Sequence, residues 1–119
     1  MIVGAKLKSA APVFCVSVAQ PTIDYLVDRL GFTLVGSAGD PPAWASLVRD
    51  QMEIMVVCGA HPPPAQDWAA YIYVAGVDEL YAEFQRRGAD LVGPPQDKPY
   101  NNREFEVRMP DGRLVAFGG

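Results

Sequence analysis

Few side chains in this sequence are of the types that perform catalysis or bind metal ions. His61 is the only histidine, and it lies in the stretch 59–64, whose three prolines cannot take part in a β-ladder. A Ser-His-Asp triad would therefore depend on a linker residue, and the glycines form no phosphate-binding loop. Cys15 and Cys58 stand in apolar, strand-like contexts, which favours buried free thiols over a disulfide or a redox role. A site must consequently be built from acids and aromatic residues that folded elements bring together.

Length, composition and charge limit the class of protein. At 119 residues, half of them hydrophobic, the chain suits one globular domain spanning 1–119. No apolar run approaches the roughly 20 residues of a membrane-spanning helix. Residues 1–9 lack the apolar core of a signal peptide, so we expect a cytoplasmic protein. The net charge of −4 argues against nucleic acid or an anionic membrane as a partner, and it is compatible with a cationic ligand.

The clearest structural pattern is a hairpin at 103–117. Its turn is the tripeptide Pro-Asp-Gly at 110–112, in which proline presets φ, aspartate bonds its own backbone and glycine accepts a positive φ. Both arms alternate, which is typical of strands with one buried face. The apolar face consists of Phe105, Val107, Val115 and Phe117, and the opposite face carries Glu104, Glu106, Arg108 and Leu114.

The rest of the chain resembles the same unit built twice. Apolar residues at helical spacing predict helices over 21–30 and 77–84, which Gly31 and Gly88 end. Strands are predicted from Val, Ile, Phe and Tyr content and from alternation. Outside the hairpin they cover 12–18, 32–36, 43–48, 51–58, 69–74 and 91–92.

Matching residues recur at an offset of 57 to 59 positions, which indicates an internal duplication. The pairs are Val16 and Val74, GFTLV at 31–35 and GADLV at 88–92, and VR at 48–49 and at 107–108. We therefore predict an α+β fold of two tandem βαβββ modules. Module one covers about 12–59, the linker 60–67 and module two about 68–118. A single module would leave one face of its four-stranded sheet bare, so the two must combine.

These modules, with YLVDRLGF at 25–32 and REFEVRMPDGRLVAF at 103–117, resemble the vicinal oxygen chelate superfamily over about residues 12–118. That superfamily contains glyoxalase I, bleomycin-resistance proteins and extradiol dioxygenases. The chain is most similar to the small bleomycin-resistance-like branch, which is also labelled glyoxalase-like. The resemblance implies cupped mixed sheets with the helices outside and a cavity inside. It also implies a homodimer whose cavities combine modules from both chains.

Enzymes of that superfamily hold a divalent metal with His, Glu or Gln side chains from the first and fourth strands of each module. Counting places three of the four positions at Ala11, Ala69 and Ala116, which cannot bind a metal. Alternation in 51–57 places Glu53 at the fourth position. One carboxylate with three alanines is no metal site, so we expect no metal and no cofactor.

The inner face of the predicted cup is an apolar and aromatic wall with a few acids, which is typical of a small-molecule pocket. Trp44, at a position where bleomycin-resistance proteins also carry an aromatic residue, is either a stacking surface or an aromatic of the core or dimer interface. Glu53 either meets a ligand cation or acts as a base, unless it is a solvated strand residue or a partner of an arginine in the last hairpin. Trp68 is expected in the core.

Two further groups complete the predicted site. Tyr71 and Tyr73 either line the pocket or pack within the sheet, and the loop 98–103 is either the pocket rim or a connector. The predicted ligand-binding residues are Trp44, Glu53, Tyr71, Tyr73, Tyr100, Arg103 and Glu106.

These observations favour metal-independent binding of a small molecule, such as a cationic antibiotic, in a dimer groove, as in drug-sequestering resistance proteins. The alternative is an enzyme of the lyase, isomerase or dioxygenase type that uses Glu53 as a base or metal ligand. The three alanines argue against that alternative. A third hypothesis is a dimeric scaffold whose cup performs no chemistry.

Overall fold

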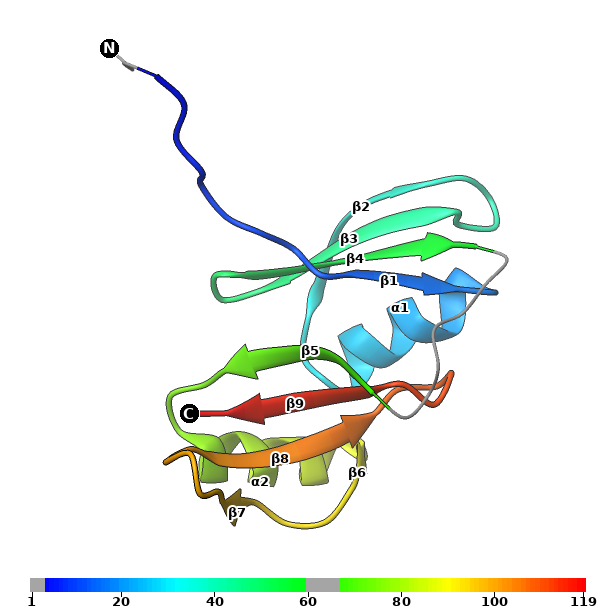
Figure 1. The fold of residues 1–119 in the computed structure, drawn as a ribbon. Coiled ribbons are helices and arrows are strands. Elements are labelled where there is room, and N and C mark those ends of the chain that lie inside the picture. The colour runs from blue at the N-terminus through cyan, green and yellow to red at the C-terminus, as the bar shows by residue number, and fades with distance from the viewer. Residues whose placement is uncertain (1–3, 60–66) are drawn as a thin grey trace.

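The first half of the chain forms one mixed sheet with a helix against it. The computed structural model describes residues 4–59 and 67–119. The sheet order is β1-β4-β3-β2, with β1 parallel to β4 and the other pairs antiparallel (Figure 1). The elements are β1 (Val13–Val16), α1 (Ala19–Asp28), β2 (Thr33–Ala38), β3 (Trp44–Arg49) and β4 (Met52–Cys58).

The second half repeats this arrangement. Its order is β5-β9-β8-β6, with β5 parallel to β9 and a two-residue strand, β7, paired with β8. The elements are β5 (Trp68–Tyr73), α2 (Val77–Arg87), β6 (Asp90–Leu91), β7 (Gln96–Asp97), β8 (Arg103–Arg108) and β9 (Leu114–Gly118). The predicted α+β class and the repeated βαβββ order are confirmed. The strand β7 was not predicted, because two polar residues in a loop carry no periodic signal.

The repeat is confirmed, but its offset in the hairpins was wrong by one or two residues. Ladder pairs in the first hairpin match those in the second at offsets of 60 and 61, as in Ala45–Val56 and Phe105–Phe117. The predicted offset of 59 would pair Arg49 with Arg108, which belong to opposite faces. A one-residue slip reverses every side chain of a strand.

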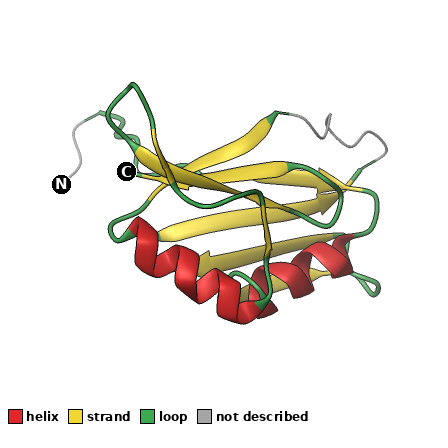
Figure 2. Cartoon of the chain, turned by 90° about the horizontal axis from the view of Figure 1, so that it is seen from below, coloured by secondary structure: helices red, strands yellow, loops and turns green. Residues whose placement is uncertain are grey.

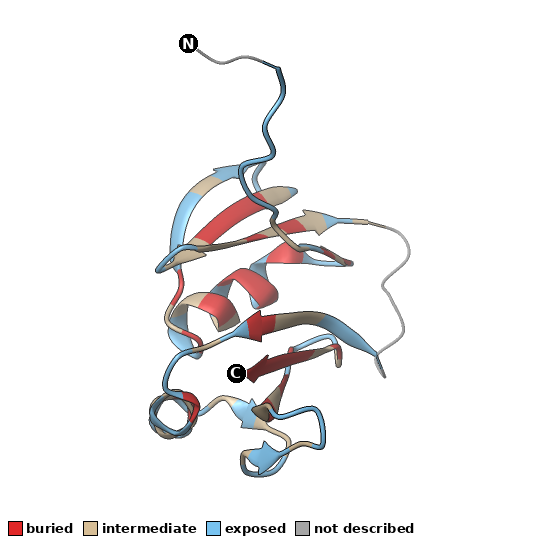
Figure 3. Ribbon diagram, turned by 60° about the vertical axis from the view of Figure 1, so that its left-hand side comes forward, coloured by how far each residue is buried: buried red, intermediate tan, exposed pale blue. Residues whose placement is uncertain are grey.

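Both helices lie on one side of the strands (Figure 2). Each buries an apolar stripe against its sheet, and the two halves share one continuous core (Figure 3). Leu26 of α1 and Phe84 of α2 occupy corresponding places, and both are buried. At roughly 25 cal/mol per Å² of apolar surface, burial of this stripe is the main force holding the helices. The sheet faces turned away from the helices, here called the outer faces, correspond to the inner wall of the predicted cup.

The C-terminal ends of the two helices meet and exchange arginines. Arg29 donates to the carbonyls of Arg87 (3.0 Å) and Gly88 (3.2 Å), and Arg87 donates to the carbonyl of Asp28 (3.4 Å). These bonds satisfy carbonyls that a helix end leaves free. Gly31 and Gly88 have φ of +74° and +78°. A Cβ at Gly88 would collide with the guanidinium of Arg29, and one at Gly31 would collide with that of Arg49 and lie 3.1 Å from that of Arg87. The predicted helix stops therefore also permit the close approach of the two modules.

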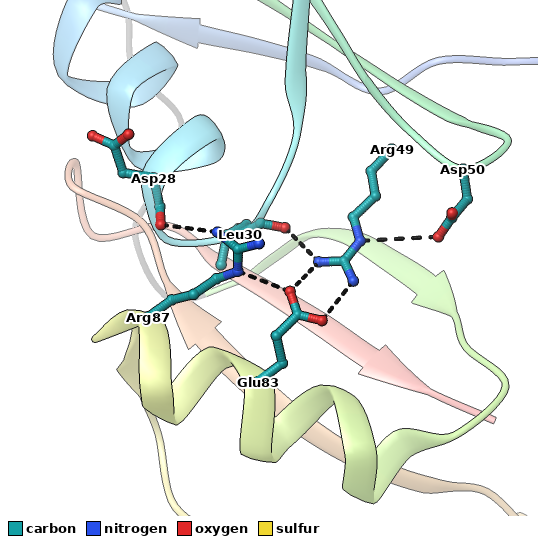
Figure 4. A network of polar contacts seen from close by, with 6 residues as sticks. All are labelled: Asp28, Leu30, Arg49, Asp50, Glu83 and Arg87. Carbon is teal, nitrogen blue, oxygen red and sulfur yellow. Dashed lines mark hydrogen bonds and ion pairs between the residues drawn. The ribbon is translucent and has the colours of Figure 1, made fainter.

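A second arginine, Arg49 of β3, fixes module one to α2 (Figure 4). Its guanidinium makes two 2.8 Å bonds to the carboxylate of Glu83 and a third to the carbonyl of Leu30. Arg87 adds a 2.8 Å bond to the same carboxylate. The bonds from Arg49 are the largest cause that lowers the pKa of Glu83 to about 2. Glu83 therefore stays ionised over the whole physiological pH range.

Among residues 4–59 and 67–119, no helix is long and apolar enough to cross a membrane.

Candidate functional site

Three aromatic rings gather on the outer face of the second sheet. Tyr71 lies between Trp68 and Tyr73, with ring centroids 5.3 Å and 5.1 Å away. Tyr71 and Tyr73 alternate with the buried Ile72, which places both on the outer face as predicted. Tyr73 is 78% exposed and Trp68 is 45% exposed. These rings thus offer an open aromatic surface to a ligand.

The position of Trp68 differs from the expectation that it belongs to the core. A register irregularity between Trp68 and Ala70 breaks the alternation of β5. Such an extra residue redirects the side chains on one side of it. The indole reaches the outer face, where its Nε1 donates to Glu106 (2.6 Å). No sequence signal distinguished this bulge from regular alternation.

Two carboxylates of β8 lie beside the rings. Glu104 is 3% exposed and accepts bonds from the hydroxyls of Tyr100 (2.6 Å) and Tyr71 (3.2 Å). Asn102 donates to the Tyr71 hydroxyl (3.0 Å) and completes the chain of bonds. The bond to Glu104 raises the pKa of Tyr100 to about 12. The groups that donate to Glu104 and Glu106, namely two tyrosine hydroxyls and the Trp68 indole, are all neutral.

A hollow of about 190 Å³ opens next to these acids. Its lining includes Trp68, Glu104 and Glu106 together with Pro94, Gln96 and Lys98. The Lys98 ammonium donates to Gln96 (3.3 Å). Within the described residues, no lysine or arginine lies within 4.0 Å of the Glu104 or Glu106 carboxylate. The hollow thus combines two acids and an aromatic ring, groups that suit a cation, with the ammonium of Lys98 in its lining.

The outer face of the first sheet carries Trp44 and Glu53. Trp44 is half-buried and its ring lies against Gly36, where a Cβ would be 3.5 Å away. Glu53 accepts a 2.6 Å bond from the hydroxyl of Ser46. Its partner is therefore Ser46 and not an arginine of the last hairpin. A carboxylate held by one hydroxyl has further lone pairs for a ligand.

Arg103 is placed away from the other predicted ligand-binding residues. It alternates with Glu104 and shares the helix-side face of β8 with Phe105. Its guanidinium pairs with Asp78 of α2 (2.9 Å) and Asp97 of β7 (3.1 Å). The structure thus brings together Tyr71, Tyr73, Tyr100 and Glu106 on one sheet, and Trp44 with Glu53 on the other.

The side chains at the superfamily's metal positions do not fit a metal ion. Ala69 and Ala116 offer no donor, and neither does Ala11 before β1. Met55 pairs with Val13 in the first sheet as Ala116 pairs with Tyr71 in the second, so Met55 is the counterpart of Ala116. Glu53 lies two residues before Met55 on the same face of β4. Among residues 4–59 and 67–119, no three His, Cys, Asp or Glu side chains lie close enough to share an ion. His61 lies outside the described residues.

A larger cleft of about 540 Å³ lies between the modules, away from both groups of predicted residues except Tyr73. Its floor is apolar and includes Phe32, Ile72 and Phe84, and the Arg49–Glu83 pair forms part of its wall. Alternation within one strand carries no information about a surface shared by two modules, so sequence patterns gave no sign of it.

Comparison with solved structures identifies the fold. TioX from Micromonospora sp. ML1 is 25% identical, with 93% of this chain and 97% of that chain covered and a TM-score of 0.77. The bleomycin-binding protein of bleomycin-producing Streptomyces verticillus, solved with copper(II)-bleomycin, is 24% identical over 96% and 97%, with a TM-score of 0.79. A glyoxalase/bleomycin resistance protein/dioxygenase superfamily member from Sphaerobacter thermophilus DSM 20745 is 20% identical over 95% and 97%, with a TM-score of 0.73. No family model and no curated protein matches the chain.

Proposed function

We propose that this chain, which has the fold of the glyoxalase/bleomycin resistance protein/dioxygenase superfamily, binds a small amphipathic or cationic molecule on its outer faces without a metal. The predicted resemblance is thereby confirmed for the fold. The observation that carries the proposal is the pair Glu104 and Glu106, whose carboxylates, within the described residues, accept side-chain hydrogen bonds from the aromatic residues Trp68, Tyr71 and Tyr100 and from no cation. A buried charge without a counter-ion is unfavourable. A ligand cation would relieve this, and the rings would hold its apolar part.

The test is a screen by thermal shift. A ligand that binds only the folded state raises stability by RT ln(1 + [L]/Kd). Metal-free bleomycin, as a cationic glycopeptide, is the first probe because a protein of the same fold was solved with its copper complex. We expect cationic aromatic antibiotics to raise the melting temperature more than neutral ones of similar size. Equal shifts for both sets would contradict a charge-based site.

In this proposal the ligand binds in a groove that the outer faces of two copies of this chain form together. The edge strand β2 of the first sheet carries exposed apolar side chains, with Leu34 43% and Val35 57% exposed. Unpaired edges with apolar neighbours favour association. A closed dimer would place Glu53 of one copy in the same groove as Glu106 of the other. Light scattering at micromolar concentration should give the mass of a dimer, whereas a monomer mass would remove the shared groove.

Metal independence is tested by elemental analysis. Because the superfamily's metal positions carry three alanines, the purified and dialysed protein should hold far less than one zinc, nickel or iron per chain. A stoichiometric metal would favour the alternative, an enzyme of the lyase, isomerase or dioxygenase type. The bond between Ser46 and Glu53 is the observation that supports it, since it orients a carboxylate that a reaction could use as a base.

A further inference from the structure

The two hairpins interchange an arginine and a methionine. In the first hairpin Arg49 faces Met52, and in the second Met109 faces Arg113. Because the ladders match at offsets of 60 and 61, Met52 is the counterpart of Arg113. The same side of each hairpin meets the first strand of the other module. Met52 and Arg113 therefore occupy one and the same position of the repeat. In module two the arginine at this position reaches across to module one, and in module one a methionine takes its place.

The Arg113 side chain is buried, and an acid, a backbone carbonyl and an aromatic ring surround its guanidinium. Its side chain is 3% exposed, and its Nε bonds the carboxylate of Asp111 (2.8 Å). One Nη donates to the carbonyl of Cys15 at the free edge of β1. The guanidinium carbon lies 5.0 Å from the ring centre of Phe14. Acid, carbonyl and apolar face together satisfy the charge and the plane of a guanidinium.

The opposite side of the repeat presents the same groups without an arginine. Ile72 replaces Phe14 and Tyr73 replaces Cys15, at the constant offset of 58. The amide of Val74 donates to Gly118 of β9 (2.8 Å). Since the two ends of a peptide unit point in opposite directions, the Tyr73 carbonyl points away from β9 toward the open edge.

Met52, Ile72 and Tyr73 all line the 540 Å³ cleft between the modules, and so do the acids Asp50 and Glu79. Arg49, the arginine that lines this cleft, is held by Glu83 (2.8 Å) and lies 3.9 Å from the exposed carboxylate of Asp50, which keeps free lone pairs for a second cation. Asp50 lies in the turn between β3 and β4 and Glu79 in the first turn of α2, and both acids are exposed at the rim. The cleft is far larger than one guanidinium, so an apolar body can lie on its floor.

We propose that this cleft binds a guanidinium or amidinium group carried on an apolar body, in the place that Arg113 fills on the other side. The cation would bond the Tyr73 carbonyl and face Asp50. The inference goes beyond the proposed function and does not depend on the outer faces, because it uses none of their acids.

The probe is phenylguanidinium, with phenylurea as its neutral control. In amide NMR spectra, phenylguanidinium should shift the signals of Ala75 and Gly76, which line the cleft, and phenylurea should not. Met52→Arg supplies the missing arginine within the chain, so it should weaken binding about tenfold or more. Met52→Leu keeps the apolar side chain and should bind like the native protein.

A second variant needs no change in the cleft floor. Asp50 is exposed and Asn tolerates its positive φ of 52°, so Asp50→Asn folds normally and should weaken binding severalfold. Unchanged affinity in both Met52→Arg and Asp50→Asn would overturn the proposal. Shifts confined to residues around Glu53 or Glu106 would also overturn it, while leaving the proposed function intact.

Discussion

Replacing Arg113 by methionine is expected to lower the free energy of unfolding by about 3 kcal/mol. Methionine is the residue that the repeat places at the matching position 52, so its shape suits this kind of site. The loss comes from the contacts of a buried guanidinium with Asp111, the Cys15 carbonyl and Phe14. Urea unfolding monitored by tryptophan fluorescence gives the value.

Arg103→Met is the matched control for that variant. Arg103 lies in the same hairpin and makes two ion pairs, but its side chain is 41% exposed. Exposed pairs contribute roughly 0–1 kcal/mol, because water and salt screen them. If Arg103→Met destabilised the protein as much as Arg113→Met, the arginine that crosses between modules would have no special role.

Glu83→Gln is expected to cost about 2 kcal/mol at neutral pH and to reduce the acid sensitivity of the fold. Glu83 accepts three charge-assisted bonds from Arg49 and Arg87, and its side chain is 25% exposed. Its pKa falls from 4.5 to about 2 on folding, so the folded state binds the proton less readily. The contribution of Glu83 is complete above about pH 4.5 and is lost as the pH falls toward 2.

Thermal unfolding between pH 7 and pH 2.5 checks this prediction. The native protein should lose stability more steeply below pH 4.5 than Glu83→Gln does. Glu79→Gln, one turn earlier on the same helix, is the control because Glu79 is exposed and forms no ion pair within the described part of the chain. Parallel pH profiles for native protein and Glu83→Gln would show that the network in Figure 4 does not set the acid limit.

Sequence patterns predicted those parts of the fold that depend on local periodicity. The hairpin around 110–112, the two helices and their glycine stops follow from alternation, helical spacing and positive φ. Tyr71, Tyr73 and Glu106 were placed on the correct face for the same reason. The repeat also predicted two modules with the same βαβββ order of elements, which the structure confirms.

The parts that failed depend on contacts between elements. A bulge, which leaves no trace in the pattern, turns Trp68 outward. Arg103 was assigned to the pocket rim, but its side chain lies on the face of β8 that Glu104 does not share, where Asp78 and Asp97 hold it. The cleft between modules and the place of Arg113 require knowing which hairpin meets which strand.

The central claim is that carboxylates of the outer faces bind a ligand cation. Isothermal titration of metal-free bleomycin into the native protein, Glu106→Gln and Glu53→Gln tests it most directly, with Asp24→Asn, at an exposed position of α1, as the control outside these faces and outside the cleft. Each amide keeps the shape of the side chain and removes its charge. We predict that Glu106→Gln and Glu53→Gln each weaken binding by roughly 1.5–3 kcal/mol, the scale of a charge-assisted hydrogen bond, and that Asp24→Asn leaves it unchanged. Equal affinities for all four proteins would contradict the account.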